Sequence, residues 1–307
     1  MNYHIPVLLD EVINLLDINP EGIYMDCTVG FGGHSESILK KLNSKGLLIG
    51  LDLDPYALKK TKEKLSQRFE NISLHNCSYS VFPQILEKMG IKEIDGFLFD
   101  LGISSYQIDS EHRGFSYMKD ASLDMRFNNE STNTRTAKEV INSISEEELS
   151  TSLKKYGDIQ KHARIARCII DERKKKQIST TYDLKRVLAK ALPYESYKKL
   201  SIVFQVIRIL VNDEIETIKR TLESTLQYLK IGGRIAIISF HSVEDRIIKH
   251  FFKDLVIYKD LSYDIHTQNL NQKLKIITKK PIIESKINIH KNPRARSAKL
   301  RVAERIK

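Results

Sequence analysis

A glycine-rich segment with an acid at its start occurs early in the chain, as Asp26-Cys27-Thr28-Val29-Gly30-Phe31-Gly32-Gly33. Glycines in a turn between a strand and a helix let the backbone approach a ligand closely. Asp52 follows 20 residues after Gly32, and a carboxylate at the end of the next strand can accept both ribose hydroxyls of an adenosine. The spacing predicts a site for a ligand that contains a nucleoside; a tight turn without a ligand is the alternative.

The details of this loop favour one class of nucleoside ligand over another. A dinucleotide site has the pattern G-x-G-x-x-G, but Ser35 occupies the place of its third glycine. The chain also lacks the phosphate loop G-x-x-x-x-G-K-[ST]. Asp26, four residues before Gly30, suits a ligand with a cationic amino-acid end. S-adenosylmethionine has an ammonium, a sulfonium and an adenosine but no phosphate, so we favour it over NAD, which a dehydrogenase would bind through the same Asp52.

A second polar segment, Asp100-Leu101-Gly102-Ile103-Ser104-Ser105-Tyr106-Gln107, follows a later apolar run. It contains no cysteine, which disfavours covalent attack on a pyrimidine ring. An exocyclic amine as methyl acceptor instead needs a group that orients its N–H and takes up the positive charge as nitrogen attacks the methyl group. Asp100, Ser104 and backbone carbonyls could do this, with Ser105 beside them; a polar cap between a strand and a loop is the alternative.

The elements that must position these segments alternate between strands and helices. Apolar runs at 23–27, 46–52, 72–75 and 94–100 predict strands separated by helices, which is typical of a parallel sheet with helices on both faces. Helical periodicity then replaces the alternation, with helices expected at 161–176, 182–192 and 201–229, before a strand at 235–240. We therefore predict an α/β Rossmann-like sheet, in two parts at 1–107 and 201–307, with an all-helical substrate-recognition domain inserted at 108–200.

Charge is distributed unevenly along the 307 residues. The formal net charge of +11 divides into −4 over 1–107, +5 over 108–200 and +10 over 201–307. An acidic first part suits a cationic small molecule, and a basic remainder suits a polyanion. The last 17 residues hold seven basic side chains and one acid, Glu304. RNA is the expected polyanion. A methyltransferase for small molecules would not need this charge, and a non-catalytic RNA-binding module would need neither Asp52 nor the glycine loop.

Several other classes are disfavoured by composition. No apolar run approaches the roughly 20 residues that span a bilayer, and the N-terminus lacks the basic and apolar regions of a signal peptide, so we expect a cytoplasmic protein without a membrane partner. Cys27, Cys77 and Cys168 are widely spaced, which argues against a disulfide scaffold or a zinc site and fits a reducing compartment. We assign these cysteines and His241 to the structure and expect no metal.

The motifs together resemble one family over essentially the whole chain, the bacterial 16S rRNA cytosine-N4 methyltransferases. The matching runs are His4-x-Pro6-Val7-Leu8-Leu9-x-Glu11, the loop from Asp26 to Ser35, Asp52-x-Asp54, Asp100 to Gln107, Arg113-Gly114-Phe115-Ser116, Leu123-Asp124-Met125-Arg126, Phe204-Gln205-x-x-Arg208-Ile209-x-Val211-Asn212, Ile238-Ser239-Phe240-His241-Ser242-x-Glu244-Asp245-Arg246 and Asn292-Pro293-Arg294-Ala295-Arg296-Ser297.

The resemblance implies a class I methyltransferase that uses S-adenosylmethionine to methylate a decoding-site cytidine of 16S rRNA in the 30S subunit. We expect it to act as a monomer or a weak homodimer and to flip the cytidine toward Asp100. Tyr79 stands where the family often has Phe and keeps a ring for stacking on adenine. The implied cofactor contacts are Gly32, Gly33, His34, Asp52, Tyr79, Asp100 and Gln107. The expected catalytic residues are Asp100, Ser104 and Ser105. The expected RNA contacts are Arg113, Arg126, Arg294 and Arg296.

Overall fold

The computed structural model describes residues 6–192, 197–255 and 273–307, so His4 of the N-terminal motif lies outside the described residues. The chain forms two compact units: the first comprises 1–102 with 217–307, and the second comprises 103–216. The second unit is thus longer at both ends than the insertion expected at 108–200. The difference at its end arises because the apolar side chains of α10 (Tyr197–Asn212) belong to the core of the second unit.

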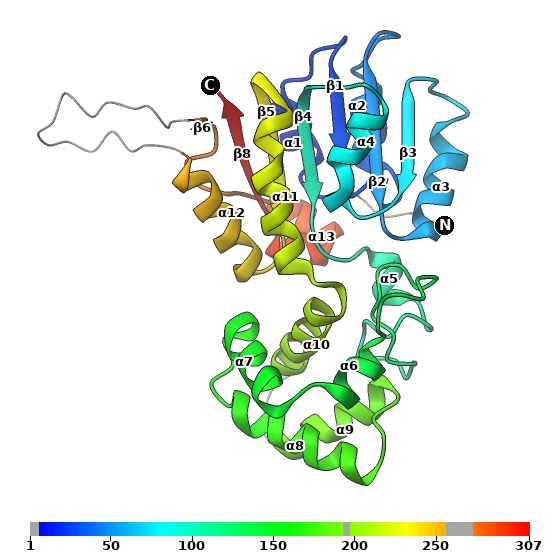
Figure 1. Ribbon diagram of the computed structural model, residues 1–307, viewed down its shortest axis with the longest axis vertical. Coiled ribbons are helices and arrows are strands. Elements are labelled where there is room, and N and C mark those ends of the chain that lie inside the picture. The colour runs from blue at the N-terminus through cyan, green and yellow to red at the C-terminus, as the bar shows by residue number, and fades with distance from the viewer. Residues whose placement is uncertain (1–5, 193–196, 256–272) are drawn as a thin grey trace, which may run out of the picture. The chain divides into compact units, whose positions relative to one another are not determined.

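The first unit contains one sheet with the strand order β3-β2-β1-β4-β5-β8-β6, and β7 pairs with β8 (Figure 1). The strands β1 to β5 pair in parallel, and β8 runs antiparallel to β5 and to both β6 and β7. The bounds are β1 (Ile23–Asp26), β2 (Leu47–Asp52), β3 (Ile72–Asn76), β4 (Ile94–Asp100), β5 (Leu229–Ser239), β6 (Leu274–Ile276), β7 (Ile282–Ile283) and β8 (Lys299–Arg305).

Helices cover both faces of this sheet because successive strand residues point to opposite sides. Leu48 and Leu98 pack with one set of helices, whereas their neighbours Ile49 and Phe97 pack with the other. The predicted α/β class with an open parallel sheet is confirmed. The first set is α1 (Leu9–Leu16), α2 (Gly33–Leu39) and α3 (Pro55–Leu65), and the second is α4 (Phe82–Lys88), α11 (Glu214–Tyr228) and α12 (Ser242–Asp254).

The second unit is helical and has its own apolar core. The helix expected at 201–229 is two helices, because Asp213 adopts a left-handed backbone conformation with φ of 48° between α10 and α11. The buried ion pair of Arg208 with Glu214, at 2.7 Å, joins the two sides of this break. The other helices are α5 (Ser105–Asp109), α6 (Ala137–Ser143), α7 (Glu146–Gly157), α8 (His162–Lys175) and α9 (Thr181–Ala191).

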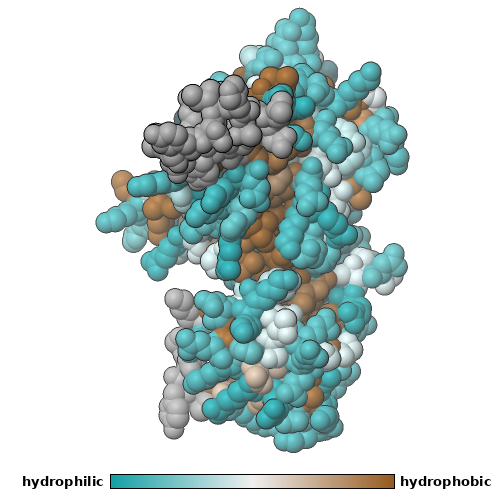
Figure 2. Space-filling model, turned by 60° about the vertical axis from the view of Figure 1, so that its left-hand side comes forward, coloured by the Kyte–Doolittle hydropathy of each residue, from teal (hydrophilic) through white to brown (hydrophobic). Residues whose placement is uncertain are grey.

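The surface is mainly polar. Figure 2 shows hydrophilic side chains across most of one face, with a narrower hydrophobic strip between them. Among the residues that the structure describes, none of the helices has both the length and the apolar composition required to span a membrane.

Candidate functional site

Three acids end three neighbouring strands of the first unit. Asp26, Asp52 and Asp100 are the last residues of β1, β2 and β4, and the order β2-β1-β4 makes these strands adjacent. Asp26 is paired in register with Gly50 and Leu98, so the other two acids lie two residues further along their strands. Because side chains alternate along a strand, all three carboxylates point to the same face of the sheet, which α2 covers.

Two of these acids shape the glycine-rich loop. Asp26 is buried and accepts hydrogen bonds from the Thr28 amide at 3.1 Å and the Ser35 hydroxyl at 2.6 Å. Asp52 accepts hydrogen bonds from the Gly30 amide at 2.6 Å and the Asp54 amide at 2.7 Å. The loop is therefore fixed by bonds within the chain, and its shape depends on both carboxylates.

The glycines of the loop differ in what surrounds them. Gly30 has φ of +52°, and a β-carbon added there would meet nothing within 4 Å. A β-carbon on Gly32 would lie 2.7 Å from Thr61 Cγ2, and one on Gly33 would lie 2.4 Å from Pro6 Cγ. The predicted contacts Gly32 and Gly33 thus allow close packing inside the protein, whereas the loop backbone faces open space at Gly30.

Asp100 lies close to His34, which is near the start of α2. The Nε2–H of His34 donates to the Val7 carbonyl at 2.9 Å, so its other nitrogen, Nδ1, is the one that lies 3.7 Å from Asp100 Oδ2. The Oδ1 atom of Asp100 is buried and has no hydrogen-bond partner among the described residues. This carboxylate consequently lacks the hydrogen bonds that would stabilise its negative charge.

Burial raises the pKa of all three acids. It raises the pKa of Asp26 and of Asp52 to about 6 in each case, against the hydrogen bonds that these carboxylates accept. The pKa of Asp100 rises to about 8, mainly through burial and further through the negative charges of Asp26 and Glu244. Mutually repelling, poorly solvated carboxylates are stabilised by an opposite charge, so the arrangement suits a cationic ligand.

An aromatic side chain flanks the same strands. Tyr79 begins the short helix η1 (Tyr79–Val81), which follows β3. Its ring meets Phe99 of β4 edge to face, with centroids 5.7 Å apart. The half-buried ring is thereby held in place after the strand that neighbours β2, as a residue that stacks on a base requires.

The second polar segment crosses from one unit into the other. Asp100 belongs to the first unit, whereas Ser104, Ser105 and Gln107 belong to the second. Ser104 and Gln107 form a capping box at the start of α5: the Ser104 hydroxyl accepts from the Gln107 amide at 3.2 Å, and the Gln107 side chain accepts from the Ser104 amide at 3.0 Å. Ser104 and Gln107 therefore have a structural role at the helix start in addition to the predicted ones.

The four predicted RNA contacts fall into two groups. Arg113 is buried and donates to the carbonyls of Arg126 and Phe127, and Arg126 pairs with Asp124 at 2.7 Å and donates to loop carbonyls. These two arginines fold their own loop, which sequence motifs alone did not reveal. Arg294 and Arg296, in the short helix η2 (Pro293–Ser297), are exposed.

One structural contact could not be predicted from the sequence. The buried Glu284 accepts a hydrogen bond at 2.9 Å from the amide of Leu8, whose φ of 54° is unusual for a non-glycine residue. This bond holds the segment that contacts His34 and Gly33. His241, which we assigned to the structure, forms a capping box with Glu244 at the start of α12.

Comparison with known proteins gives one consistent result. The family model described as the MraW methylase family matches residues 1–306. A protein named ribosomal RNA small subunit methyltransferase H from Caldicellulosiruptor bescii is 45% identical over 309 residues, which cover 99% of each chain. Proteins of the same name from Clostridium botulinum (strain Kyoto) and Caldicellulosiruptor saccharolyticus are 46% and 43% identical, with 99% and 100% of each chain covered.

Proposed function

Because this chain belongs to the MraW methylase family, we propose that it methylates N4 of a decoding-site cytidine of 16S rRNA in the 30S subunit. The methyl donor is S-adenosylmethionine. We further propose that the protein works in the cytoplasm as a monomer or a weak homodimer. The relatives share the name of a small-subunit rRNA methyltransferase over their whole length, and the basic later part of the chain agrees with an RNA substrate.

The residues of the first unit fit a cationic donor. Among the described residues, one oxygen of the Asp100 carboxylate has no hydrogen-bond partner, and this oxygen is the observation on which the assignment chiefly depends. Asp52 ends β2, where a carboxylate can accept ribose hydroxyls, and Gly30 leaves open space beside the loop. Asp52, Gly30, Tyr79 and Asp100 would hold the donor, which when bound supplies an electrophilic methyl group on a sulfonium.

The chemical task of the chain's own residues concerns the acceptor amine. The lone pair of N4 is conjugated with the pyrimidine ring, so a group that binds an N–H improves its alignment and takes up developing charge. When N4 forms its bond to the methyl carbon, the carbon–sulfur bond of the donor breaks and S-adenosylhomocysteine leaves. The nitrogen becomes positive and must lose one proton. The Asp100 carboxylate ionises more readily beside a cation, because an opposite charge lowers its pKa. We assign Asp100 as the group that receives this proton, with Ser104 and Ser105 as further polar contacts.

Mass mapping of small-subunit rRNA tests the proposal. Cells that lack the protein should lose one methyl group from a decoding-site cytidine, and the wild-type chain should restore it. The Asp100→Ala variant should restore it poorly although it is expressed and folded. A methyl group that persists without the protein, or that disappears from a different RNA or a small molecule instead, would reject the proposed substrate.

A further inference from the structure

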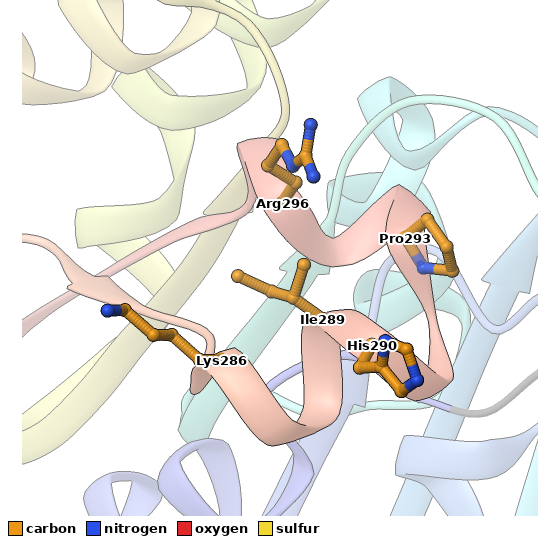
Figure 3. A pocket seen from close by; sticks show the side chains of 5 residues that line it. All are labelled: Lys286, Ile289, His290, Pro293 and Arg296. Atoms are coloured by element: carbon orange, nitrogen blue, oxygen red, sulfur yellow. The ribbon is translucent and has the colours of Figure 1, made fainter.

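A basic pocket lies in the first unit, in the segment that precedes β8. Its volume is about 410 Å³, and it is lined by Lys286, Ile289, His290, Pro293 and Arg296 (Figure 3). These residues belong to α13 (Lys286–Lys291) and to η2, which follows it directly. Figure 3 shows Ile289 between Lys286 and Arg296, whereas His290 and Pro293 lie side by side where one helix passes into the next.

The sheet register places this pocket at the edge that carries the three acids. Because β8 is antiparallel to β5, its first residue, Lys299, pairs with Ser239, the last residue of β5. Residues immediately before Lys299 therefore lie at the edge where β1, β2, β4 and β5 end. In the order β4-β5-β8, two strand spacings separate Asp100's strand from β8, which is roughly 10 Å across the sheet.

Lys286 and Arg296 of the pocket form no ion pair with any residue that the structure describes, unlike the basic residues of the strand that follows. Within residues 6–192, 197–255 and 273–307, no acid lines the pocket, and Lys286, His290 and Arg296 are exposed without an ion pair. By contrast, Lys299 and Arg301 of β8 both pair with Asp245, at 3.0 and 2.7 Å.

Contacts inside the protein hold both Glu284 and the backbone around the pocket in place. Glu284 is buried, where it accepts hydrogen bonds from the Leu8 amide at 2.9 Å and the Asn288 side chain at 2.8 Å. Ala295 and Ala298 are buried in the same core as Leu8. The cations thus lie on a backbone that the core holds in place, and the carboxylate of Glu284 is occupied by hydrogen bonds to Leu8 and Asn288.

We propose that this pocket binds a backbone phosphate of the substrate RNA, close to the nucleotide that is methylated. The proposal rests on the proposed function and adds Lys286 and His290 to the expected contact Arg296. Lys286 and Arg296 provide the positive charge, the His290 imidazole can donate a hydrogen bond, and Ile289 with Pro293 offers an apolar surface for a sugar or base. An RNA is favoured over other polyanions because the pocket shares the sheet edge of the methylation site.

Salt-dependent binding to isolated 30S subunits tests this assignment. Each phosphate contact makes the slope of log K against log salt steeper by about 0.7 to 0.9. Removing the two cations that hold this one phosphate, in Lys286→Ala/Arg296→Ala, should therefore make the slope shallower by about 0.7 to 0.9. Affinity at low salt should fall on the order of tenfold. The charge-preserving variant Lys286→Arg/Arg296→Lys should keep the wild-type slope, and calorimetric binding of S-adenosylmethionine should be unchanged in both variants.

A matched control removes two exposed lysines from the opposite edge of the sheet. Lys41 follows α2 and Lys88 ends α4, and both helices return the chain to the edge where the next strand begins. Lys41→Ala/Lys88→Ala should bind 30S subunits with the wild-type slope. If both double-alanine variants behave alike, or if only binding to heparin or anionic vesicles changes in the pocket variant, the pocket assignment is wrong. If the wild-type chain does not methylate rRNA, the proposed function itself is rejected.

Discussion

Replacing Asp100 by asparagine should stabilise the protein in the absence of donor while abolishing most of its methyl transfer. The Asp100 side chain is only 14% exposed and lies 3.7 Å from His34, and no residue in the described part of the chain bonds to its Oδ1 atom. Asparagine has nearly the same shape but no charge, so it removes the free-energy penalty of a poorly solvated carboxylate. The same change removes the carboxylate that we propose as the proton acceptor.

The size and the sign of the stability effect follow from the pKa of Asp100. That pKa is raised from 3.8 to about 8, so between these two values the unfolded chain has released a proton that the folded protein retains. The contribution of Asp100 to the free energy of unfolding therefore falls as the pH rises through this window, by about 1.4 kcal/mol per pH unit. The Asp100→Asn variant carries no charge at this position and does not show this loss. The difference between its free energy of unfolding and that of the wild-type protein should therefore grow from near zero at pH 4 to about 4 kcal/mol at pH 7.

Urea unfolding at a series of pH values, without donor, measures this difference. Glu87→Gln replaces an exposed carboxylate on α4 and serves as the control, which should follow the wild-type pH dependence. The reasoning is refuted if Asp100→Asn is less stable than the wild-type protein at pH 7, or if the difference between them does not change with pH.

Two further predictions concern the loop and the N-terminal segment. Gly30→Ala should lower the affinity for S-adenosylmethionine by more than tenfold but destabilise folding by only about 1 to 2 kcal/mol, because its β-carbon projects into open space. Gly32→Ala should be destabilised more in urea, because its β-carbon also meets Thr61. A Gly30→Ala variant less stable than Gly32→Ala would contradict this prediction. Glu284→Ala should lower the free energy of unfolding by about 1 to 3 kcal/mol, because it leaves the buried amide of Leu8 unpaired; an unchanged urea midpoint would show that this bond contributes nothing.

The parallel part of the sheet could be predicted because each strand is an apolar run with a polar end. The runs before Asp26, Asp52 and Asp100 are buried from both faces, and short strands between helices leave few alternatives. The antiparallel strand β8 was not predicted. Only its first four residues alternate between charged and apolar. The density of basic side chains there indicates a nucleic-acid contact, because the sequence does not show that Asp245 pairs with two of them.

Roles that depend on contacts distant in the sequence could not be predicted. The resemblance implied an RNA contact for Arg113, and the motifs gave no sign of its burial or of its hydrogen bonds to the carbonyls of Arg126 and Phe127. The break at Asp213 was hidden because the apolar periodicity continues on both sides of it. The bond from Leu8 to Glu284 spans 276 positions, and no local pattern in the sequence specifies it.

A crystal structure of the protein soaked with S-adenosylmethionine tests the central claim most directly. We expect electron density for the donor across the carboxyl ends of β1, β2 and β4, with a positively charged group beside the Asp100 carboxylate and the ribose at Asp52. Donor bound elsewhere in the first unit, or at these strand ends with no cationic group near Asp100, would contradict the account.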